Sequence, residues 1–95
     1  VPVPTPRDIA PYRNGLLVLE YEVLEVLDGR YDATTLLVAH WIIRDATLLD
    51  TARRPSGTVV RMTLDPYAAH DELEGERLVM DSDRFDLPLY YDLAP

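Results

Sequence analysis

The stretch that decides the fold is LLVLEYEVLEVLDG, residues 16–29. In its first half Leu17, Leu19 and Tyr21 share one face of an alternating pattern, and Glu20 lies on the other. An amphipathic helix needs apolar residues three and four positions apart, and the interspersed glutamates break that stripe. The alternation therefore predicts a β-strand.

The second half of the stretch predicts a bend and then a turn. The apolar phase shifts by one residue at Val23–Leu24, which indicates a bend or bulge within a strand running from Leu16 to Leu27. Asp28-Gly29 follows, and this dipeptide is a strong signal for a hairpin turn.

Further strands are expected downstream, at Thr34–Arg44, Thr58–Leu64, Arg77–Met80 and Leu87–Leu93. A short helix is expected over Tyr67–Leu73, because Asp65 can cap a helix and Pro66 suits its first position. Pro88 predicts that the last strand lies at a sheet edge. The order β-β-β-α-β-β predicts an all-β fold with one short helix, a five-stranded OB-like Greek-key barrel.

The chain divides into two parts. Residues 1–14 carry prolines at positions 2, 4, 6 and 11, which predicts an extended arm or linker. Residues 15–95 are long enough for a single domain and are expected to form the barrel.

Composition excludes several classes of function. The 95 residues carry a net charge of −8, which repels a polyanion and argues against nucleic-acid binding. No apolar run is long enough to cross a membrane as a helix, so no membrane insertion is expected. The chain contains no cysteine, which removes thiolate catalysis and zinc–thiolate sites. No cofactor is expected.

Aromatic and arginine side chains are the best candidates for binding. Surface tyrosines offer rigid, amphipathic contacts for sugars or proteins, although the same rings could cover the barrel ends. The candidate binding residues are Trp41, Tyr67, Tyr90, Tyr91, Arg44 and Arg61.

Signals for metal binding and catalysis are poor. Asp81, Asp83 and Asp86 are spaced somewhat like a calcium loop, but Phe85 stands where an oxygen ligand would be needed, so no metal is predicted. Neither serine lies in a Gly-x-Ser-x-Gly elbow. His40 lies in the most apolar strand, where a structural role is the usual one. No catalytic residue is predicted.

Four phrases together resemble a small β-module that accompanies bacterial SGNH-type acyltransferases or esterases of exopolysaccharide modification. They are Ile9-Ala10-Pro11-Tyr12, Tyr21-Glu22-Val23-Leu24-Glu25-Val26-Leu27-Asp28-Gly29, Val38-Ala39-His40-Trp41 and Asp86-Leu87-Pro88-Leu89-Tyr90-Tyr91-Asp92. The resemblance implies an extracytoplasmic accessory domain, periplasmic or secreted, with catalysis elsewhere in the parent protein. The chain lacks the Gly-Asp-Ser and Asp-x-x-His blocks of that hydrolase family.

Three functions remain open from the sequence. The first is a non-catalytic accessory or interaction module, whose partner is a protein or a neighbouring domain of the parent chain. The second is a carbohydrate-binding module that stacks a polysaccharide on Trp41 or the tyrosines. The third is a small acidic hydrolase, which would need His40 or His70.

Overall fold

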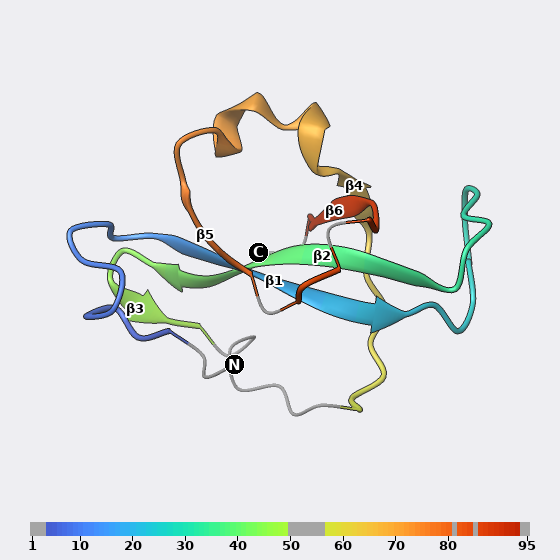
Figure 1. The fold of residues 1–95 in the computed structure, drawn as a ribbon, viewed down its shortest axis with the longest axis horizontal. Coiled ribbons are helices and arrows are strands. Elements are labelled where there is room, and N and C mark those ends of the chain that lie inside the picture. Colours follow the sequence, from blue (N-terminus) through green and yellow to red (C-terminus); the bar gives the residue numbers. More distant parts are fainter. Residues whose placement is uncertain (1–3, 50–56, 81, 85, 94–95) are drawn as a thin grey trace.

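Two long strands form the centre of a single mixed β-sheet (Figure 1). They are seen in a computed structural model that describes residues 4–49, 57–80, 82–84 and 86–93. The strands are β1 (Gly15–Glu22), β2 (Thr35–Arg44), β3 (Thr47–Leu48), β4 (Leu64–Pro66), β5 (Arg77–Met80) and β6 (Leu89–Asp92). Two short 3-10 turns, η2 (Tyr67–Ala69) and η3 (Asp71–Leu73), connect β4 to β5.

The sheet has the order β4-β6-β2-β1-β5, with β3 paired to the end of β2. β1 and β2 pair antiparallel, whereas β5 joins β1 and β6 joins β2 in parallel. A fold composed mainly of strands is confirmed. The described strands form one open sheet, so closure into a five-stranded OB-like barrel is not confirmed.

Alternation along β1 and β2 gives the sheet two apolar faces. One face, called here the turn-side face, buries Leu16, Val18, Leu37 and Ala39 beneath Leu73 of η3. The opposite, arm-side face has its own buried cluster, made of Ile9, Leu17, Ile42 and Ile43. Apolar burial on both faces explains why β2 is almost continuously hydrophobic.

The segment before β1 packs against the sheet. Ile9 is buried, and its Cδ1 lies 3.1 Å from where a Cβ on Gly15 would stand, so a glycine allows this close approach. The Arg13 guanidinium forms an ion pair with Asp45 at 2.7 Å. The Arg13 carbonyl accepts a hydrogen bond from the backbone N–H of Ala46. These contacts join the first segment to the β2–β3 turn.

Three details of the predicted elements are wrong. β1 ends at Glu22, before the predicted limit at Leu27, and its register shift lies between Gly15 and Leu16. Residues 58–63 are not a strand, and only Leu64–Pro66 pairs, as β4. The predicted helix over Tyr67–Leu73 is instead the two 3-10 turns η2 and η3.

The predicted position of the last strand is also wrong. β6 lies inside the sheet, between β4 and β2, and not at an edge. Pro88 itself stands just before the strand, so its missing N–H breaks no hydrogen bond of the ladder. Its carbonyl accepts a hydrogen bond from the backbone N–H of Leu37 and so helps to align β6 with β2.

Candidate functional site

Several of the predicted binding residues meet on the turn-side face. The β2–β6 register pairs Ala39 with Tyr91, which brings Trp41 to the same face as Tyr91. The Trp41 Nε1–H donates a hydrogen bond to the Tyr91 hydroxyl at 2.8 Å. The Arg44 guanidinium lies over the Trp41 ring, 4.3 Å from its centre, in a cation–π contact. One face of the indole is therefore covered by this chain's own arginine.

His70 fastens the two 3-10 turns to the sheet. Its Nε2 lies 2.8 Å from an Asp65 carboxylate oxygen in β4, and its Nδ1 lies 2.8 Å from a Glu72 carboxylate oxygen in η3. Its ring also stands edge-on to Tyr91, with 4.8 Å between the ring centres. Only the protonated imidazole can donate to both carboxylates, so this geometry favours the cation.

The carboxylates of Glu72 and Asp65 favour the protonated form of the His70 imidazole. Hydrogen bonds to Glu72 and then to Asp65 raise the pKa of His70, and the same contact with His70 lowers the pKa of Glu72. Because the pKa of His70 is higher in the folded state, protonation of His70 stabilises the fold fully at pH values below its unfolded-state pKa of about 6.5. This stabilisation is lost as the pH rises through the pKa of His70 in the folded state. The Glu72 contribution is present above pH 4.5 and is lost as the pH falls through its lowered pKa.

We therefore expect the protein to lose stability as the pH rises from about 6.5 through the raised pKa of His70. The urea midpoint of the unmodified chain should fall over this interval, and that of a His70→Phe variant should fall less, because phenylalanine keeps the ring contact but carries no charge. Midpoints measured by Trp41 fluorescence at several pH values would check this. Parallel pH profiles for the two proteins would contradict it.

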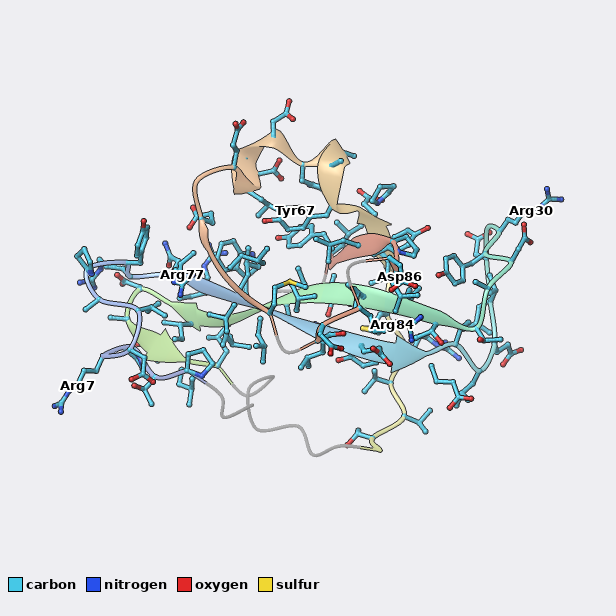
Figure 2. The ribbon with its side chains drawn as sticks, in the orientation of Figure 1. Arg7, Arg30, Tyr67, Arg77, Arg84 and Asp86 are labelled. Atoms are coloured by element: carbon cyan, nitrogen blue, oxygen red, sulfur yellow. The ribbon has the colours of Figure 1, made fainter. Side chains whose placement is uncertain are left out.

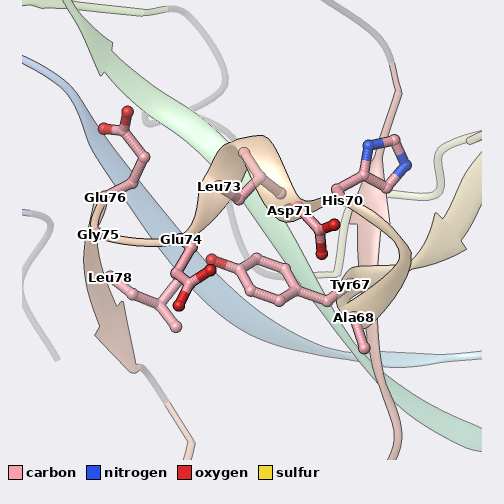
Figure 3. Close-up of a pocket in the computed structure, with 9 residues that line it drawn as sticks. All are labelled: Tyr67, Ala68, His70, Asp71, Leu73, Glu74, Gly75, Glu76 and Leu78. Carbon is pink, nitrogen blue, oxygen red and sulfur yellow. The ribbon is translucent and has the colours of Figure 1, made fainter.

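A shallow pocket of about 360 Å³ opens between the turns and the start of β5. Tyr67 extends beneath the turns into it, and the His70 ring points away (Figure 3). Three acidic residues, Asp71, Glu74 and Glu76, also line this pocket. Burial raises the pKa of Tyr67, and the nearby Glu76 charge raises it further. The pocket is thus an aromatic surface with an acidic rim.

A buried polar network lies on the arm-side face. His40 Nδ1 lies 2.9 Å from a carboxylate oxygen of Asp92, and His40 Nε2 lies 2.8 Å from the Tyr21 hydroxyl. His40 is 1% exposed and Asp92 is 7% exposed. When Nδ1 of the neutral imidazole donates its hydrogen bond to the Asp92 carboxylate, Nε2 accepts a hydrogen bond from the Tyr21 hydroxyl. The network joins β1, β2 and β6, and its order resembles the hydroxyl–imidazole–carboxylate series of hydrolases.

The structure brings together four of the six predicted binding residues: Trp41, Arg44, Tyr67 and Tyr91. The other two lie elsewhere. Tyr90 alternates to the arm-side face, where its ring meets Tyr31 edge-on at 5.8 Å. Arg61 is exposed in the segment before β4.

The candidate calcium loop is not assembled as a ligand set among the described residues. Asp86 forms an ion pair with Arg84 at 3.0 Å, which lowers the pKa of Asp86 (Figure 2). Asp83 is exposed, and Asp81 lies outside the described residues. Within the described ranges, no three His, Asp or Glu side chains are grouped so that they could hold a metal ion.

Sequence reasoning missed a group of large apolar side chains that are exposed close together in the chain. Residues 23–27, called here the docking segment, expose Leu24 (68%), Val26 (42%) and Leu27 (57%) to solvent. They belong to the long β1–β2 connection, which extends beyond the sheet and carries Arg30 near its tip (Figures 1 and 2). The shift of the apolar pattern at Val23–Leu24 could have revealed this exposure, because β1 ends just before it, at Glu22.

No helix among the described residues has the length and apolar character needed to cross a membrane. No family model, curated protein or solved structure matches this chain.

Proposed function

We propose that this chain is a non-catalytic interaction module that binds a partner protein, or a neighbouring domain of its parent chain, through the docking segment. The observation that carries the proposal is the exposure of Leu24, Val26 and Leu27 on one projecting segment. Isolated exposed apolar residues are ordinary, but large ones grouped together are typical of interaction surfaces. Burial of these three side chains against a partner would supply a hydrophobic centre for the interface.

The surroundings of the docking segment support the same proposal. Glu22, Glu25 and Asp28 lie within or beside it, so the apolar centre has a charged border. Protein interfaces are commonly built in this way, with a desolvated centre and a polar rim.

The carbohydrate-binding alternative is weakened by the environment of Trp41. A sugar-stacking tryptophan presents an open ring face, whereas Arg44 lies over one face of this indole and Tyr91 holds its N–H. The Tyr67 pocket retains an aromatic surface, but three acidic residues line it. The geometry supports protein binding better.

The sequence resemblance suggests the first partner to test. The modules that this chain resembles accompany SGNH-type acyltransferases of exopolysaccharide modification, so an acyltransferase or esterase domain of that type is the partner we propose. In that arrangement the module works outside the cytoplasm and leaves catalysis to its neighbour.

The test replaces the exposed leucines with aspartate. We expect a Leu24→Asp, Leu27→Asp variant to bind the purified neighbouring domain at least about tenfold more weakly, because charged side chains cannot enter an apolar interface centre. Isothermal titration calorimetry would measure the affinity. A Val59→Asp variant is the matched control, because Val59 is 76% exposed and lies outside the docking segment. Equal affinity of the leucine variant and the unmodified chain would contradict the proposal.

A further inference from the structure

The docking segment has the sequence pattern of a strand but no strand partner within the described ranges. The β1–β2 ladder ends at the Glu22–Thr35 pair, and the β1–β5 ladder ends at the Val18–Met80 pair. Beyond Glu22, the described backbone makes one further cross-strand hydrogen bond, from the Val23 N–H to the Thr34 carbonyl. Residues 24–27 then continue past the sheet with no described backbone partner.

Such a segment is a template for another strand. An extended backbone with unpaired N–H and C=O groups readily adds a further chain by main-chain hydrogen bonding. Val23, Leu24, Val26 and Leu27 also favour extended structure when their side chains have a surface to pack on. A partner strand would supply both the missing hydrogen bonds and the missing apolar contacts.

The negative charge along the docking segment indicates which kind of partner strand can bind there. Glu22, Glu25 and Asp28 lie along it, and the sequence has no basic residue between Arg13 and Arg30. A second copy of this chain carries −8 and would place glutamate beside glutamate, which is unfavourable in strand pairing. A partner strand with arginine or lysine places opposite charges there.

We propose that residues 23–27 bind, by strand addition, an extended segment of a partner protein in which apolar residues alternate with arginine or lysine. This inference rests on the proposed function and adds to it the mode of contact and the chemistry of the partner. The main chain of the partner pairs with the docking segment, its apolar residues cover Leu24 and Val26 on one face, and its cations meet Glu25 on the other. Such binding is weakened by salt, because its charges lie at the surface.

The probe is a capped peptide of about seven residues that alternates valine and arginine, which is the length of an ordinary strand. Two matched peptides serve as controls: one has glutamate in place of arginine, and one has N-methyl groups on all its amides, which removes the N–H donors along both edges. Amide chemical shifts of the labelled protein would report where each peptide binds. We expect the arginine peptide to perturb amides in and beside residues 23–27, with at least about tenfold weaker binding of both controls.

Three outcomes would overturn the inference: no binding of the arginine peptide at roughly millimolar concentration, equal binding of the arginine and N-methylated peptides, or shifts confined to other strands. A chain that dimerises through residues 23–27 in sedimentation experiments would overturn the choice of occupant. Failure here is distinguishable from failure of the proposed function. If none of the peptides binds but the Leu24→Asp, Leu27→Asp variant still binds its protein partner more weakly, strand addition is wrong. The proposal that the docking segment binds a protein would then still hold.

Discussion

Replacing His40 with alanine is expected to lower the free energy of unfolding by about 3–5 kcal/mol, a large part of the stability of a small domain. The substitution removes the imidazole that bridges Asp92 and Tyr21. Asp92 remains buried, and its carboxylate loses a hydrogen-bond partner 2.9 Å away. Removing one member of a buried, hydrogen-bonded pair is costly because the other is desolvated and no longer fully compensated.

Urea unfolding followed by the fluorescence of Trp41 would measure this loss. The matched control is Asp83→Ala, which alters an exposed side chain and should change the free energy of unfolding by less than about 0.5 kcal/mol. A His40→Leu, Asp92→Leu double variant should be more stable than the sum of the two single changes predicts, because it removes the buried charge together with its partner. A His40→Ala loss below about 1 kcal/mol would show that the network contributes little.

A second large effect is expected for Leu16→Ala, with a loss of about 3 kcal/mol in the free energy of unfolding. Leu16 is completely buried on the turn-side face, where it packs in one cluster with Leu73 of η3. Alanine at this position leaves a cavity that the surrounding strands can only partly fill. The effect should appear in the urea midpoint with little change in the slope of the transition.

Leu24→Ala is the matched control for this prediction. The side chain and the substitution are the same, and both leucines lie in the stretch that decides the fold. Leu24 is 68% exposed, so its loss should change the stability by less than about 0.5 kcal/mol. A stability loss as large for Leu24→Ala as for Leu16→Ala would mean that the docking segment belongs to the core, which would contradict the proposed function.

The sequence predicted the elements whose signals are local. Alternation located most of β1, and the apolar run of residues 34–44 located β2. Arg77–Met80 was predicted as a strand and is β5. These elements follow from the period of the side chains, which can be read without knowledge of any distant partner.

The helix prediction failed because the seven residues of Tyr67–Leu73 are too few to sustain an α-helix by themselves. Short isolated helices are marginal, and packing decides their form. Here His70 interrupts the backbone between the two turns, with φ of −113° and ψ of 83°. Its side chain bonds Asp65 and Glu72 on either side, which fixes the 3-10 geometry.

The candidate site was only partly predictable for a different reason. Trp41 and Tyr91 could be named as aromatic candidates, but their contact depends on the parallel register of β2 with β6. His40 and Asp92 stand 52 residues apart, and no local pattern joins them. Exposure of the docking segment follows from where the ladders stop, which is a tertiary property.

The position of β6 has a consequence for how the molecule assembles. β1 and β2 are joined by one connection and can pair early, because the entropy cost of closing a loop of this size is modest. β6 instead enters between β4 and β2 and adds in parallel, so its contacts are long-range and slow to form. Until β6 (Leu89–Asp92) has paired with β2, the edge of β2 that β6 covers remains exposed to solvent. His40 also lacks its contact with Asp92 at this stage. Chains interrupted before β6 are therefore the species in which we expect aggregation to begin.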